Sequence, residues 1–297
     1  MKRLVSIICV CVVLLTGVTA CGAKTVKTPE HRLQWWLSDI QWDGERAPYT
    51  GKGVDIALLD TGVYGEHPDL AGRIISQTKV PGLGIVEKES KEHGTGIAGV
   101  IAAKPHYEKG ALGVATDANI ISIDVTDNPD GKVVVNNLIA GIDMAVSKDV
   151  DIINISVGVK EGTDELHQAI KNAYDKGIVI IASAGNHVEN DILYPAAYDE
   201  VIAVGSLSKD REFVSPTGAV AIKKVVYLPG ENIVSTSASD DYKGFSGTSF
   251  SCGIMTGMVA VSLQANEGME KEKFQKRVYA QAKELYGKAG VSVNDLL

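Results

Sequence analysis

Residues 151–186 read DIINISVGVKEGTDELHQAIKNAYDKGIVIIASAGN, and this stretch decides the fold class. Its two apolar runs, 151–156 and 178–182, are short and rich in isoleucine and valine, which is typical of strands covered on both faces. Between them, apolar residues recur at every fourth position from Leu166 to Tyr174, along one face of a helix. Strand, helix and strand in this order predict a parallel βαβ unit.

The same alternation continues on both sides of this unit. Further short apolar runs predict strands at residues 54–59, 119–123 and 201–204. Leu138, Ile142 and Val146 share one helical face, which predicts a second crossover helix. The sequence therefore predicts an α/β protein with one doubly wound parallel sheet, helices on both faces, and functional sites at the carboxyl ends of the strands.

Composition narrows the classes of function. The chain has 297 residues, of which 45% are hydrophobic and 22% charged, as in an ordinary soluble globular protein. Asp and Glu total 37 against 29 Lys and Arg, so the formal net charge is −8. Binding to nucleic acid depends on cationic groups that neutralise phosphates, so we expect no nucleic-acid partner for this acidic chain.

The N-terminus has the layout of an export signal. Lys2 and Arg3 precede an apolar run at 4–15, and small residues follow it. This segment ends in VTAC at 18–21, which resembles a bacterial lipobox, where a signal peptidase cuts before a cysteine that carries lipid. The sequence therefore predicts that Cys21 is lipidated.

This N-terminus also predicts the organisation and location of the chain. We expect a signal peptide at 1–20, a tether at 21–34 and a single domain at 35–297, anchored to the outer face of the cell membrane. Two alternatives stay open. An ordinary signal peptide followed by a chance cysteine would release a secreted protein, and an uncleaved signal would act as an anchor helix.

Two short motifs carry candidate catalytic side chains. Asp60 stands in LLDTG at 58–62, at the carboxyl end of the first predicted strand, where capping of the glycine turn is the usual explanation. His93 opens HGTGIAGV at 93–100, which predicts a helix of small residues that packs closely against its neighbours. A single histidine is more often a structural hydrogen-bonding group, so neither motif decides the function by itself.

Two further motifs place polar groups beside helix or strand ends. Ser249 stands in GTSFSCG at 247–253 and opens another small-residue helix, whose dipole favours a developing oxyanion; the alternative is an N-cap serine. Asn186 ends IIASAGN at 180–186, a buried strand and its turn. Its amide is either a turn former or a donor to an oxyanion.

Taken together, the order Asp60, His93, Asn186 and Ser249 resembles that of the subtilisin family of serine proteases, the subtilases. The resemblance runs from about residue 35 to the C-terminus and includes EHPDL at 66–70. It implies a serine endopeptidase with a subtilisin-like fold, acting on peptide or protein substrates as a monomer and without a cofactor for its chemistry.

The resemblance also implies a role for each site residue. Ser249 is the expected nucleophile, His93 its base, Asp60 the group that orients the imidazole, and Asn186 the oxyanion donor. Within NISVG at 154–158, an edge formed by Ser156, Val157 and Gly158 is expected to pair with an extended substrate and to shape the pocket for the residue before the cleaved bond.

The chain departs from the family pattern near the nucleophile. Where the family has Gly-Thr-Ser-x-Ala-x-Pro, this chain has Ser251 for the alanine and Gly253 for the proline, which loosens the turn that presents Ser249. Gly96 stands where many members carry a second histidine. A catalytically weak homologue that acts as a binding lipoprotein is therefore one alternative. A selective processing protease for one secreted peptide is another, because there is no room for a prosegment before residue 35.

Two more residues have open interpretations. Asp69 matches an acidic position near a calcium site in many family members, so a structural calcium ion is one expectation and a turn or cap residue the other. Cys252 is either a buried small hydrophobic residue or a thiol whose modification displaces Ser249.

Overall fold

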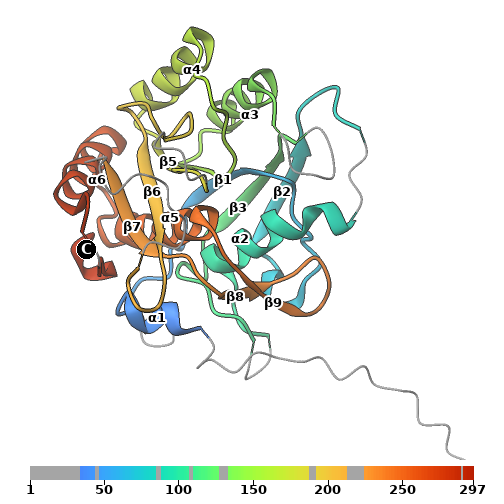
Figure 1. Ribbon diagram of the computed structural model, residues 1–297, viewed down its shortest axis with the longest axis vertical. Helices are drawn as coiled ribbons and strands as arrows, with labels where there is room; N and C mark the ends of the chain where they lie inside the picture. The colour runs from blue at the N-terminus through green and yellow to red at the C-terminus, as the bar shows by residue number, and fades with distance from the viewer. Residues whose placement is uncertain are drawn as a thin grey trace, which may run out of the picture.

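The computed structural model describes residues 34–43, 47–84, 88–106, 110–126, 133–186, 192–212, 224–288 and 290–297 (Figure 1). The predicted signal peptide, Cys21 and the tether up to residue 33 lie outside this part of the chain, so they stay predictions. Among the helices of the described ranges, none has the length and apolar character needed to cross a membrane.

One sheet of seven parallel strands forms the centre of the described structure, in the order β2-β3-β1-β4-β5-β6-β7. The strands are β1 (Asp55–Asp60), β2 (Ile74–Lys79), β3 (Asn119–Asp124), β4 (Ile152–Ile155), β5 (Val179–Ser183), β6 (Ile202–Leu207) and β7 (Val225–Pro229). An antiparallel hairpin of β8 (Ile233–Thr236) and β9 (Tyr242–Phe245) stands apart from this sheet.

Helices cover both faces of the sheet (Figure 1). One apolar core holds residues of α2 (Glu92–Ala102), α5 (Thr248–Ala265) and α6 (Lys271–Leu285), together with the short helix α1 (Trp35–Asp39). The second core, on the opposite face, holds residues of α3 (Val135–Ser147) and α4 (Asp164–Asp175). Along β1, Ile56 and Leu58 contribute to the first core and Ala57 and Leu59 to the second, which is the alternation that a sheet covered on both faces requires.

This architecture confirms the predicted doubly wound α/β fold, including all five predicted strands and both crossover helices. The sequence analysis missed β2, β7 and the hairpin. Strand β2 reads IISQTK, lies at one edge of the sheet and alternates half-buried with exposed residues, so it lacks the continuous apolar run of the inner strands.

The strand order also fixes where a site can form. The chain begins the sheet at β1, adds strands on one side, and then crosses to β4 on the other side of β1. Ligands of open α/β sheets bind outside the carboxyl ends of the strands at such a reversal. Asp60 ends β1 and Ser156 directly follows β4, so both lie at this position.

Candidate active site

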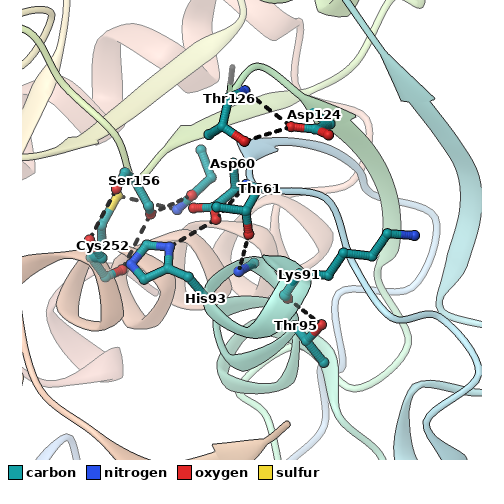
Figure 2. Close-up of polar contacts among 12 residues, drawn as sticks. Asp60, Thr61, Lys91, His93, Thr95, Asp124, Thr126, Ser156 and Cys252 are labelled. Carbon is teal, nitrogen blue, oxygen red and sulfur yellow. Dashed lines mark hydrogen bonds and ion pairs between the residues drawn. The ribbon is translucent and has the colours of Figure 1, made fainter. Parts of the chain in front are cut away.

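Asp60 and His93 form a direct hydrogen-bonded pair. His93 Nδ1 lies 2.8 Å from Asp60 Oδ1, and the carboxylate is fully buried (Figure 2). The first turn of α2 reaches β1 closely because residue 94 is glycine: a Cβ there would lie 2.2 Å from the backbone oxygen of Gly62. The Gly94 N–H also donates to Thr61 Oγ1 at 3.1 Å, which ties α2 to the turn after β1.

The charge on Asp60 controls the protonation of His93. Burial lowers the pKa of His93, but the charge and the hydrogen bond of Asp60 outweigh it, so the pKa is raised above the ordinary 6.5. With its Nδ1–H donated to Asp60, the neutral imidazole has its Nε2 lone pair available to accept a proton.

Ser249 is the second residue of α5 and is 6% exposed. Its hydroxyl donates to the backbone oxygen of Ser156 at 3.0 Å, so within the described part of the chain it is bonded to this oxygen and not to His93 Nε2. Because Ser249 lies in the first turn of a helix, its backbone N–H has no acceptor one turn earlier and stays available to a ligand.

The orientation of the Asn186 side chain is set by Thr248. Asn186 Oδ1 accepts from the Thr248 backbone N–H at 2.9 Å and from Thr248 Oγ1 at 3.0 Å. A backbone N–H bonds only to an acceptor, so the amide oxygen faces Thr248 and the NH₂ group faces the other way. Asn186 is exposed, and its amide donors are therefore accessible beside the first turn of α5.

A buried polar network supports the nucleophile turn from behind. Asn154 Nδ2 donates to Thr256 Oγ1 at 2.7 Å and to Cys252 Sγ at 3.2 Å, while Asn154 Oδ1 accepts from Ser156 Oγ at 2.8 Å. Figure 2 shows Ser156 and Cys252 side by side here. Burial raises the pKa of the Cys252 thiol to about 12, so the thiol is neutral, and its full burial favours the structural interpretation of this residue.

The unusual Gly96 has a steric explanation. A Cβ at residue 96 would lie 2.9 Å from the ring of Phe245 and 3.0 Å from that of Phe250. These two rings stack with centroids 4.7 Å apart, and Phe250 also meets the His93 ring edge-on at 5.5 Å. The aromatic pair thus fills the space that a larger residue at 96 needs.

The surroundings of Asp69 do not fit a calcium ion. Asp69 is 1% exposed; its Oδ1 accepts from the His106 backbone N–H, and its Oδ2 accepts from the Ala111 backbone N–H and from Tyr242 Oη, each at 2.7 Å. Calcium needs six to eight oxygen ligands, but these neighbours are hydrogen-bond donors. Within the described ranges, moreover, no group of three His, Cys, Asp or Glu side chains is placed to hold a metal.

The structure therefore brings together most of the residues that the sequence singled out, and it adds two. Asp60, His93, Ser249, Asn186 and the edge formed by Ser156, Val157 and Gly158 all lie at the carboxyl ends of β1, β4 and β5 or at the starts of α2 and α5, whereas Asp69 lies in a separate turn at Pro68–Leu70. The sequence analysis overlooked Thr248 and Asn154. The sequence signal for Thr248 is that it directly precedes Ser249, and the signal for Asn154 is that it lies in β4, two residues before Ser156.

Comparison with known proteins agrees with this arrangement. The sequence pattern of the Subtilase family matches residues 51–294. An intracellular serine protease of Paenibacillus polymyxa is 37% identical over 244 residues, which cover 78% of this chain and 73% of that protein. The major intracellular serine protease of Bacillus subtilis (strain 168) is 34% identical over 266 residues, which cover 86% of this chain and 77% of that protein.

A solved structure supports the fold independently. Sphericase superposes with a TM-score of 0.72 at 24% sequence identity, covering 85% of this chain and 91% of its own. This likeness shows a subtilisin-like fold. Members of the Subtilase family need no cofactor for catalysis. Since the family pattern and relatives of more than 30% identity both span most of the sequence, the chain belongs to the subtilase family and is a subtilisin-like serine protease.

Proposed function

We propose that this chain hydrolyses peptide bonds as an endopeptidase, with Ser249 as nucleophile, His93 as base, Asp60 as the group that orients the base, and Asn186 as an oxyanion donor. The observation that carries the proposal is the 2.8 Å bond between His93 Nδ1 and the buried Asp60 carboxylate. It selects the imidazole tautomer whose Nε2 accepts a proton.

The first step needs an activated serine. A serine hydroxyl is a poor nucleophile at neutral pH, so Ser249 Oγ must turn from the Ser156 oxygen toward His93 Nε2 as substrate binds. Hydrogen bonds of this kind are often misaligned before substrate is bound. His93 takes the hydroxyl proton as Oγ attacks the carbonyl carbon, and the resulting imidazolium is stabilised by Asp60.

The second requirement is stabilisation of the tetrahedral oxyanion. The Asn186 NH₂ group and the Ser249 backbone N–H are the two donors proposed for this oxygen, and the dipole of the 18-residue helix α5 adds to them. His93 then gives its proton to the leaving amine. A water molecule, deprotonated by the same imidazole, releases the acyl group and regenerates Ser249.

We propose that an extended substrate pairs with the edge formed by Ser156, Val157 and Gly158. This edge directly follows β4, and Ser156 O lies 3.0 Å from Ser249 Oγ, so a chain paired along the edge passes the nucleophile. Backbone pairing fixes the substrate direction with little dependence on sequence, which suits a protein or peptide substrate.

Active-site labelling and variants test the assignment. A fluorophosphonate should label wild-type protein at Ser249, and both Ser249→Ala and His93→Ala should lose peptidase activity by a factor of about 10⁶. Circular dichroism checks that each variant is folded. Full retention of peptidase activity by both variants would contradict the proposed function.

Two other functions are tested by the same measurements. The bond from Ser249 Oγ to the Ser156 oxygen favours a catalytically weak homologue that acts as a binding protein, and folded protein that resists labelling would support it. Labelled protein that leaves casein intact would support the selective processing protease.

We also propose export and membrane anchoring through lipidated Cys21, with a monomeric domain on the outer face of the membrane. This rests on residues 1–21 alone, since two of the relatives are named intracellular proteases. In a bacterial host, Cys21→Ala should move the protein from the membrane fraction to the medium and abolish labelling by a fatty-acid probe. Gel filtration of the domain tests the monomeric state.

A further inference from the structure

Three segments surround the space beside the proposed oxyanion donors: 156–159, 184–186 and 193–194. Tyr194 and Val159 exchange two backbone hydrogen bonds of 2.9 Å, and the Leu193 N–H donates to the Ala184 oxygen at 3.0 Å. Leu193 is therefore held between the edge that follows β4 and the turn that leads to Asn186.

The side chain of Leu193 spans the gap between these two walls. A Cβ atom placed on Gly158 would lie 3.0 Å from Leu193 Cβ and 3.2 Å from Leu193 Cδ1. A Cβ placed on Gly185 would lie 2.8 Å from Leu193 Cγ and 3.0 Å from the same Cδ1. The isobutyl group thus packs against both glycines, and the residue is half-buried.

The proposed mechanism directs one substrate side chain toward this gap. The reacting carbonyl carbon must lie beside Ser249 Oγ with its oxygen toward Asn186. The Cα of the residue before the cleaved bond is only about 1.5 Å from that carbon. On a substrate paired with the edge at 156–158, this side chain therefore points between that edge and the turn at Gly185. This step rests on the proposed function.

We propose that Leu193 limits the enzyme to small side chains, those of glycine, alanine and serine, at the residue before the cleaved bond. The gap already holds a leucine in contact with both walls, so a phenylalanine or leucine of the substrate would overlap with it. Close-packed protein rarely absorbs such a volume without displacement of backbone. One methylene group in a rigid pocket changes kcat/KM by roughly 10–200-fold, so the discrimination is large.

Matched peptides that differ only at this position test the proposal. For the wild type, kcat/KM should be at least tenfold higher with alanine than with phenylalanine. Leu193→Gly, and to a smaller extent Leu193→Ala, should raise the ratio of phenylalanine to alanine cleavage at least tenfold. Because this ratio is measured within one preparation, it does not depend on the fraction of folded enzyme.

Ile192→Ala is the matched control. Ile192 is the preceding apolar residue, but it is buried in the core beneath α3 and α4, so its loss should lower stability and leave the ratio within threefold. A wild type that prefers phenylalanine, or Leu193 variants with an unchanged ratio, would overturn the proposal.

Labelling of Ser249 distinguishes a failure of the Leu193 proposal from a failure of the proposed function. A small fluorophosphonate reacts with Ser249 without filling the gap beside Leu193. Labelled enzyme with the wrong preference therefore refutes the role of Leu193 alone, whereas folded protein that is neither labelled nor active refutes the proposed function and this inference with it.

Discussion

At the scale of single residues, hydrogen-bond donors decide how the site groups are oriented. Thr248 supplies two donors to Asn186 Oδ1, which leaves only one orientation for that amide. Asp60 Oδ1 receives two donors, the Thr61 N–H at 2.7 Å and His93 Nδ1 at 2.8 Å. Each proposed catalytic group is therefore positioned by a neighbour in the turn that carries it or by the adjacent element.

The raised pKa of His93 predicts the pH dependence of activity. His93 must be neutral to accept the Ser249 proton, so kcat/KM should fall as the pH drops through a pKa above 6.5. Asp60→Asn removes the charge that raises this pKa, so the acid limb should move to lower pH while kcat falls by about 10⁴. Steady-state kinetics between pH 5 and 9 measure both effects. An acid limb that does not move in Asp60→Asn would contradict this role of Asp60.

Thr248→Val tests whether Asn186 is positioned by its neighbour. The variant keeps the backbone donor to Asn186 but loses the hydroxyl donor, and it should reduce kcat about tenfold with KM unchanged, as expected for one hydrogen bond. Asn186→Ala removes the oxyanion donor itself and should reduce kcat by about 10²–10³. Equal activity of Thr248→Val and the wild type would mean that the backbone bond alone orients the amide.

At the scale of elements, the site depends on how closely α2 approaches the turn after β1. A Cβ atom on residue 94 would lie 2.2 Å from the backbone oxygen of Gly62. Because both atoms are fixed to the backbone, no side-chain rotation can relieve this overlap. The same helix approaches the hairpin: the Ser235 hydroxyl donates to the Gly96 oxygen at 2.7 Å, and the Thr236 hydroxyl donates to the Thr95 oxygen at 2.8 Å. Helix α2 is thus fixed on two sides, and His93 is held with it.

Gly94→Ala should separate His93 from Asp60. The added methyl group forces α2 away from β1, so we expect a loss of at least 10²-fold in kcat and a fall in the free energy of unfolding of about 1–3 kcal/mol. Kinetics and urea denaturation measure the two effects. Gly84→Ala is the control, since a Cβ at residue 84 meets no atom of the described residues within 4 Å and should change neither quantity.

The strands and helices differ from individual site residues in how far the sequence predicts them. The inner strands and the α3 and α4 helices follow from local patterns. A strand buried on both faces leaves a short continuous apolar run, and a helix buried on one face leaves apolar residues at every third or fourth position. Leu193 and Asn154 carry no such mark. Their importance depends on which distant segments they meet, and a periodic pattern does not contain that information.

At the scale of the whole molecule, Asp69 joins three parts of the chain that are far apart in sequence. Its carboxylate connects the turn at Pro68–Leu70 with the loop at His106 and Ala111 and with Tyr242 in β9. The His67 ring also packs edge-on against Tyr242, with centroids 5.3 Å apart. A carboxylate satisfied in this way stabilises the fold without a metal ion.

The contribution of Asp69 to stability should therefore not depend on calcium, so calcium and a chelator should shift the melting temperatures of the wild type and of Asp69→Asn alike. Asp69→Asn replaces one acceptor by a donor and leaves a buried N–H or hydroxyl unpaired, so the free energy of unfolding should fall by about 1–3 kcal/mol. Asp175→Asn, which breaks only an exposed ion pair with Lys171 on α4, should cost less than about 1 kcal/mol. A chelator that lowers the melting temperature of the wild type but not that of Asp69→Asn would indicate calcium binding at Asp69 instead.

The strand order has a consequence for the time at which activity first exists. Neighbouring strands in this sheet come from distant parts of the sequence, as when Ile56 pairs with Ile152, and such non-local pairing makes folding slow. The contact between Ser156 and Ser249 joins residues 93 positions apart, and α5 is among the last elements to be synthesised. In a growing chain, the proposed base His93 and its partner Asp60 are therefore synthesised before the proposed nucleophile Ser249. Under the proposed mechanism, such a chain has no peptidase activity until α5 has been made and has packed beside them.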